Sequence, residues 1–204
     1  SVYSFIVKPK GDRYNNKKSI GDSELILNTE IFNHQYINRE AEVVAIPSSI
    51  DTEINIGDTI MIHHNVFRRW HNQHGIEKNS RSYISEGLYA ISPDQIYMRK
   101  VYKKWEPING YCFIQPIKSN DIFNNNINRG YAEERPNIGI VKYTDGSFEI
   151  GSLVGFTPKS EFEFIVDKQR LYRIRTEDIT IEYEYQGNEE EYNPSWAESS
   201  GRTD

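Results

Sequence analysis

The sequence has only one cysteine, Cys112, in 204 residues, which excludes an intrachain disulfide. A lone thiol suits a reducing compartment. No apolar run approaches the roughly 20 residues of a membrane-spanning helix, and residues 1–4 lack the charged and apolar regions of a signal peptide. We therefore expect no membrane partner and a location in the cytoplasm, or assembly there.

The sequence also lacks a surplus of basic residues. Lys and Arg number 24 against 30 Asp and Glu, which leaves a formal charge of −6. Because phosphate binding needs a basic surface, we do not expect nucleic acid as the main partner. Residues 67–70 (FRRW), with Lys78 and Arg81, form a small basic and aromatic patch that could stack bases. A subunit contact or a solvated loop is the simpler interpretation.

Catalytic motifs are missing as well. There is no Gly-x-Ser-x-Gly elbow, no Walker loop and no His-Glu-x-x-His. We therefore predict no catalytic residues, no cofactor and no enzyme activity. The histidines at 63, 64, 71 and 74 suggest zinc, but the cysteines and carboxylates of structural zinc sites are absent nearby. On a strand, His63 and His64 would point to opposite faces. We expect exposed histidines in a polar loop and no metal site.

The apolar residues that are present favour strands. There are 14 Tyr and 9 Phe, and aromatic and branched residues are enriched in β-sheets. Short apolar runs alternate with segments rich in Gly, Pro, Asn and Asp, and no stretch has a long helical period. This pattern predicts an all-β protein built as a sandwich or barrel.

An internal repeat organises these strands. Residues 3–10 (YSFIVKPK) match residues 111–118 (YCFIQPIK). The segments that begin at Ile56 and at Leu88 match those that begin at Ile150 and Leu171. The three matches occur in the same order, at spacings of 108, 94 and 83 residues. Shrinking spacings indicate that loops differ in length while strands correspond, so we predict two tandem small barrels with one strand order.

The repeat sets the predicted domain boundaries. The first barrel covers 1–100 and the second covers 111–185. A linker at 101–110 joins them, where Pro107, Asn109 and Gly110 interrupt regular structure. The acidic and polar tail at 186–204 is expected to lack a packed core of its own.

Each half resembles a subunit of the GroES-type co-chaperonin family. That family has an opening strand, a mobile loop with an aliphatic triplet, a Gly-Asp turn before a central strand, and a closing Asp-Ile strand. Here residues 10–32 hold the position of the mobile loop, and Leu25-Ile26-Leu27 that of the triplet. Residues 56–62 (IGDTIMI) match the Gly-Asp strand, and residues 160–179 of the second half resemble the family's last third.

The resemblance implies a co-chaperonin lid. Such a lid binds a chaperonin ring through Leu25, Ile26 and Leu27, assists protein folding, and leaves ATP chemistry to its partner. It also implies a homo-oligomer, as in the heptameric ring of the family. The Asn-, Ile- and Lys-rich composition and residues 62–69 resemble bacteriophage versions, which implies a location in the host cytoplasm.

Two features depart from the family and keep an alternative open. Only residues 47–55 separate the strands that flank the family's roof hairpin, so that roof is short or absent. The second loop, residues 119–136, has no aliphatic triplet. The alternative function is a virion structural or decoration protein that contacts phage capsid or tail proteins, since fold does not determine function. Without the resemblance, the triplet reads as a short strand of the barrel's own sheet.

Overall fold

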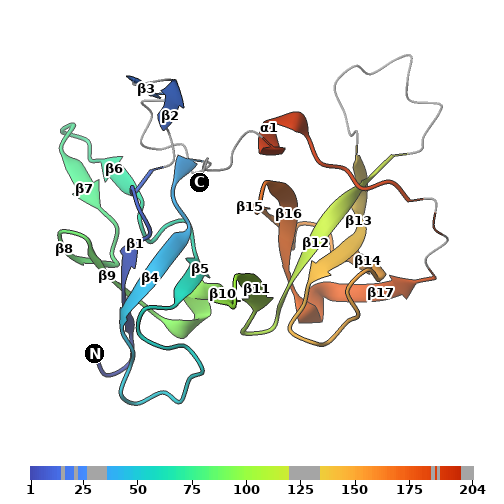
Figure 1. The fold of residues 1–204 in the computed structure, drawn as a ribbon, viewed down its shortest axis with the longest axis horizontal. Helices are drawn as coiled ribbons and strands as arrows, with labels where there is room; N and C mark the ends of the chain where they lie inside the picture. Colours follow the sequence, from blue (N-terminus) through green and yellow to red (C-terminus); the bar gives the residue numbers. More distant parts are fainter. Residues whose placement is uncertain are drawn as a thin grey trace. The chain divides into compact units, whose positions relative to one another are not determined.

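The chain divides into two compact units, Ser1–Asn109 and Gly110–Asp204. In the described residues of both units, the regular structure is almost all β-strand (Figure 1), which confirms the predicted all-β class. In this computed structural model no described helix is long and apolar enough to cross a membrane. The structure describes residues 1–14, 17–20, 23–26, 36–119, 134–184, 187 and 189–198, with only the backbone at 17–20 and 23–26.

A seven-stranded sheet forms the first unit. Its strands, in spatial order, are β11 (Lys104–Pro107), β10 (Ile96–Val101), β5 (Thr59–Ile62), β4 (Glu40–Ala45), β1 (Phe5–Pro9), β9 (Leu88–Ile91) and β8 (Tyr83–Ser85). Two hairpins lie outside this sheet. They pair β2 (Lys17–Ile20) with β3 (Ser23–Ile26), and β6 (Arg69–His71) with β7 (Glu77–Asn79).

A six-stranded sheet forms the second unit. Its spatial order is β15 (Phe162–Val166), β16 (Gln169–Arg175), β12 (Tyr111–Lys118), β13 (Glu134–Tyr143), β14 (Leu153–Phe156) and β17 (Ile179–Tyr183). Each unit has a short 3-10 turn. In the first unit η2 (Pro93–Gln95) precedes β10, and in the second unit η4 (Thr176–Asp178) precedes β17. A short helix, α1 (Ser195–Glu198), follows the last strand.

The two sheets have the same strand order. Strands β8, β9, β1, β4, β5 and β10 correspond in turn to β15, β16, β12, β13, β14 and β17, and β11 extends the first sheet by one strand. Local hydrogen bonds repeat as well. The backbone N–H of Gly57 donates to the Val43 carbonyl at 2.8 Å, and that of Gly151 donates to the Val141 carbonyl at 2.9 Å. The predicted tandem repeat is therefore confirmed at the level of individual bonds.

Both turns have a backbone conformation with positive φ, which favours glycine at this position of the repeat. Gly57 has φ +90° and Gly151 has φ +97°, a region that residues with a Cβ rarely adopt. Each glycine ends the turn that leads into the strand beside β4 or β13. The Ile-Gly matches in the sequence thus mark equivalent turns.

Equivalent residues fill the two cores. In the second unit the central cluster contains Ile114, Val141, Val154, Phe156 and Ile174. Strand pairing places these residues at the positions of the first-unit core residues Val7, Val43, Ile60, Ile62 and Ile91. Because adjacent strands contribute to one cluster, each sheet curls around its own core. Among the described strands, the edges do not pair with each other, so each sheet is an open, barrel-like layer.

The strand pairing corrects the first sequence match by one residue. In the structure Val7 lies opposite Val43 and Tyr89, and Ile114 lies opposite Val141 and Tyr172. The true spacing between β1 and β12 is therefore 107 residues, not 108, and Pro9 corresponds to Pro116. The one-residue error cannot be seen in the sequence, because β12 has apolar residues on both of its faces. It nevertheless matters, since a shift by one residue assigns every side chain to the opposite face of the strand.

The expected linker differs from the structure, and the tail, which was expected to lack a packed core of its own, makes contacts with the second unit. Residues 104–107 form β11, which pairs with β10 as the edge of the first sheet, so most of the predicted 101–110 linker belongs to the first unit. Part of the tail packs on the second unit: the backbone N–H of Tyr192 donates to the Pro116 carbonyl at 2.8 Å, and Ala197 is fully buried. The acidic residues of the tail do not prevent this, because Lys118 pairs with Glu190 at 2.6 Å.

Candidate functional site

The base of the loop between β1 and β4 is closed by paired backbone and a buried amide. Tyr14 and Ile37 form an antiparallel bridge across it, and both side chains are buried in the core. Asn38 is 1% exposed. Its amide donates to the carbonyls of Lys10 and Asp12, at 3.0 and 2.8 Å, and its carbonyl oxygen accepts the Glu40 N–H. A buried amide with all these bonds satisfied holds both ends of the loop together.

Within this loop, Leu25 and Ile26 lie on β3, and Leu27 lies outside the described residues. β3 pairs with β2, where Lys18 lies opposite Leu25 and Lys17 lies opposite Ile26. The two strands form a separate two-stranded sheet. The interpretation of the triplet as a strand of the barrel's own sheet is therefore wrong for Leu25 and Ile26. The reason is the closed base at Tyr14 and Ile37, beyond which β2 and β3 pair with each other and not with the main ladder.

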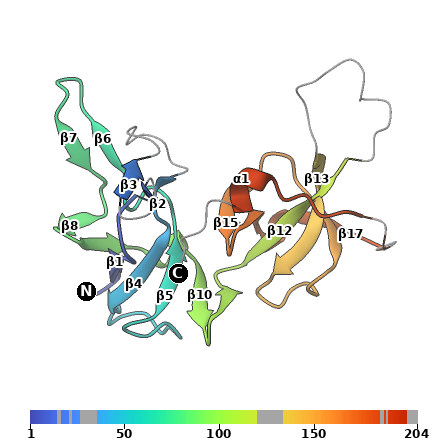
Figure 2. The same ribbon diagram turned by 45° about the horizontal axis from the view of Figure 1, so that its top comes forward.

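A second hairpin, β6–β7, is fastened to the same base. The Arg13 guanidinium donates to the Phe67 carbonyl at 2.7 Å and to the Arg68 carbonyl at 3.2 Å. The Tyr14 hydroxyl accepts the N–H of Arg69 at 2.9 Å, and the Arg69 guanidinium lies over the Tyr14 ring, 4.9 Å from its centroid. Both views show the β2–β3 and β6–β7 hairpins at one end of the first unit (Figures 1 and 2).

The predicted basic and aromatic patch is divided by this packing. Phe67 is fully buried and meets Tyr89 edge-on, with 4.8 Å between ring centroids. Arg69 packs on Tyr14 and pairs with Glu77 at 3.2 Å. Only Trp70 of the two aromatic residues in the patch faces solvent, at 43% exposure. The patch therefore divides into a core residue, a contact with the loop base and a surface residue, and is not one platform for bases.

The second unit has an ionic network at the corresponding place. Glu134 opens β13, directly after the second loop, and its carboxylate pairs with Arg170. Arg170 also pairs with Glu163 at 2.7 Å and donates to the Tyr172 hydroxyl at 2.6 Å, and that hydroxyl donates to Glu134. Burial raises the pKa of Tyr172, and the bond to Glu134 raises it further. Sequence reasoning missed this group, since Glu134 and Arg170 are 36 residues apart in the chain.

The four histidines of the zinc hypothesis do not form a metal centre. Among the described residues, no three His, Cys, Asp or Glu side chains gather to hold an ion. The expectation of opposite faces for His63 and His64 required a strand through both residues, but β5 ends at Ile62 and the two rings stack with centroids 4.4 Å apart. His71 and His74 are exposed in and beside β6, as expected.

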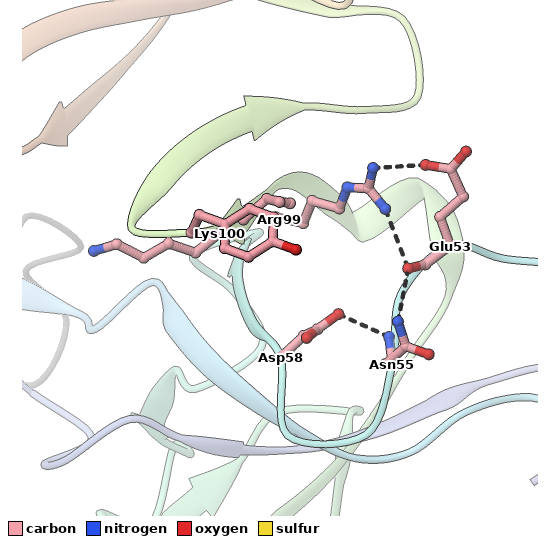
Figure 3. Close-up of a pocket in the computed structure, with 7 residues that line it drawn as sticks. Glu53, Asn55, Asp58, Arg99 and Lys100 are labelled. Carbon is pink, nitrogen blue, oxygen red and sulfur yellow. Dashed lines mark hydrogen bonds and ion pairs between the residues drawn. The ribbon is translucent and has the colours of Figure 1, made fainter.

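A shallow hollow of about 290 Å³ lies beside the Gly57 turn (Figure 3). Arg99 points to Glu53 there, with its guanidinium 2.6 Å from the carboxylate and 3.1 Å from the backbone carbonyl. Asp58 accepts the N–H of Asn55 at 2.8 Å, while the Lys100 ammonium extends away and lies over Trp105. These polar groups hold the turn, so we assign the hollow a structural role.

Cys112 is fully buried in β12, as the sequence indicated. Its sulfur lies 3.7 Å from the Thr144 hydroxyl and 3.6 Å from that of Thr176. It occupies the place of Phe5 in the repeat. A buried thiol between two hydroxyls has no access to a substrate.

We found no match between this sequence and a model of any known protein family or a curated protein.

Proposed function

We propose that this protein is a co-chaperonin-like lid, which binds a chaperonin ring through the loop that carries Leu25, Ile26 and Leu27. One observation carries the proposal. β3, with two of the three aliphatic residues, pairs only with β2 among the described strands and stands apart from the seven-stranded sheet. A short apolar segment whose backbone stands apart from the main sheet, at a closed loop base, has the properties of a peptide that docks on a partner.

The energetics require several copies of the loop. Burying an aliphatic side chain contributes about 1.5–3 kcal/mol, and ordering a loop offsets part of that gain. A single triplet therefore binds weakly, whereas a homo-oligomeric ring presents several loops at high effective concentration. We propose a ring assembly for this reason, with ATP binding and hydrolysis belonging to the chaperonin.

Co-sedimentation with a purified chaperonin ring tests the proposal. The protein is mixed with the ring with and without ATP, and the bound fraction is measured. We expect nucleotide-dependent binding, and light scattering of the free protein should give a multiple of 23.9 kDa. A monomer at micromolar concentration that never sediments with the ring would rule out the lid.

A virion structural or decoration protein is the second candidate. The observation that favours it is the connection between β4 and β5, residues 46–58, which contains no strand. A family roof hairpin would lie here, and a lid without it closes a chamber less completely. Mass spectrometry of purified virions distinguishes the candidates: stoichiometric protein in particles, with no affinity for a chaperonin, supports the second.

A further inference from the structure

The β6–β7 hairpin is an insertion that only the first unit carries. The connection from β5 to β8 spans residues 63–82, whereas the corresponding connection from β14 to β15 spans only residues 157–161. The two units otherwise share strand order and core positions. Because the second unit folds without such a hairpin, the barrel-like sheet does not require it. The hairpin therefore has a role other than completing the core of the sheet.

Cross-strand pairing gives the hairpin two distinct faces. Trp70 lies opposite Lys78, while Arg69 and His71 lie opposite Asn79 and Glu77. Side chains alternate between faces along a strand, so Trp70 and Lys78 share one face. The other face holds Arg69, which packs on Tyr14 at the loop base.

The face with Trp70 is apolar, cationic and uncovered. Trp70 is 43% exposed and Ile76, two residues before Lys78, is 55% exposed. Lys78 is exposed as well. Between residues 66 and 81 there are four Lys and Arg residues against one Glu, in a chain whose formal charge is −6. An exposed Trp beside a cation on a locally basic element suits an acidic surface that has an apolar pocket.

The hairpin is also rigid before any partner arrives. At its tip the Asn72 side-chain oxygen accepts the N–H groups of His74 and Ile76, at 3.0 and 2.9 Å. Gly75 adopts φ +73° and donates to the Asn72 carbonyl at 3.0 Å. At its root the Ser80 hydroxyl donates to the Val66 carbonyl. A preformed element loses little conformational entropy on binding.

We propose that the β6–β7 hairpin is a second docking element, whose Trp70 and Lys78 face binds an acidic protein surface with an apolar pocket. The inference rests on the proposed function, since the partner is the chaperonin ring that receives the neighbouring loop. Tyr14 links the two elements, because it bridges to Ile37 at the loop base and also contacts Arg69. Loop and hairpin then form one composite surface, in which the loop supplies the aliphatic contact and the hairpin supplies the aromatic and charged contact.

The test compares two matched double variants for binding to purified chaperonin with ATP. Trp70→Ala/Lys78→Glu changes the hairpin face. Tyr102→Ala/Lys103→Glu makes the same kind of change in the exposed turn between β10 and β11. We expect the first variant to bind at least tenfold more weakly and to lose part of the salt dependence, because a charge contact is removed. The control should bind as the wild type does, and both should keep the wild-type melting temperature.

Each other outcome has a definite meaning. If the hairpin variant binds as tightly as the control while Ile26→Asp does not bind, the lid stands and the hairpin proposal is wrong. If wild-type protein fails to bind the ring, both proposals fall. A fluorescent single-stranded oligonucleotide serves as a further probe. If it binds the wild type and not the hairpin variant, with chaperonin binding unchanged, the face recognises nucleic acid and the protein-docking proposal is overturned.

Discussion

The Tyr14 hydroxyl accepts the backbone N–H of Arg69 at 2.9 Å, and the Arg69 guanidinium lies over the same ring. One tyrosine thus joins the base of the β1–β4 loop to the root of the β6–β7 hairpin. Tyr14 is 6% exposed, so water does not readily replace this hydrogen bond, and losing the bond costs free energy. The two elements are therefore held by the same buried side chain.

Tyr14→Phe is expected to lower the free energy of unfolding by about 1 kcal/mol, because it removes one partly buried hydrogen bond and keeps the ring. Urea unfolding measures the change. Tyr3→Phe is the control, since Tyr3 is 70% exposed and should unfold as the wild type does. Equal stability of the two variants would mean that the Tyr14 hydroxyl contributes nothing.

Ile26→Asp should abolish chaperonin binding and leave the melting temperature unchanged. A charge costs little in water but several kcal/mol in an apolar groove, and β3 is not a strand of the main sheet. Sedimentation with the ring and thermal melting of the same variant measure the two effects. Ile127→Asp in the second loop should do much less, because that loop has no contiguous apolar triplet. A melting temperature lowered by several degrees would instead place Ile26 in a core.

Arg170→Met should destabilise the second unit by about 2–3 kcal/mol, since it leaves two partly buried carboxylates without their cation. Its side chain is 12% exposed, and those of Glu134 and Glu163 are 25% and 35% exposed. Arg175→Met is the matched control, because the Arg175–Glu177 pair is exposed and such pairs contribute little. Chemical denaturation of both variants measures the difference, and similar midpoints would contradict the assigned role of the network.

The stability of the second unit should fall as the pH rises from about 10 to about 12. Burial, and after it the neighbouring Asp167 carboxylate, raise the pKa of Tyr143 from 10.0 to about 12. A raised pKa means that the folded state holds the proton more tightly, so the stabilisation is complete below pH 10 and is lost as pH passes 12. Thermal melts across this range measure the loss. Tyr143→Phe should reduce the pH dependence, and an unchanged slope would show that Tyr143 does not cause it.

Much of the architecture was predictable because local signals repeat. Alternating apolar residues mark strands, and the Ile-Gly pairs at 56–57 and 150–151 mark equivalent turns that need positive φ. Three matched segments in one order sufficed to predict two units with one strand order. The Leu25-Ile26-Leu27 triplet was visible for the same reason, as an apolar run in a polar segment.

Other features depend on partners that are distant in the chain. The register of β12 was misread by one residue, because Cys112, Phe113 and Ile114 are all buried and only pairing with β16 decides which face each residue occupies. The Arg170 network and the docked tail join residues that are far apart in the sequence.

The fold class, the repeat and the position of the aliphatic triplet in the chain could be read from the sequence, because they follow from local period, turn chemistry and composition. Tertiary structure alone decided that β3 leaves the main sheet, that Phe67 is core while Trp70 is surface, and that Tyr14 ties the loop base to the hairpin. The physical reason is that burial and hydrogen bonding are satisfied between segments distant in the chain, and a single strand does not specify which segment will lie beside it.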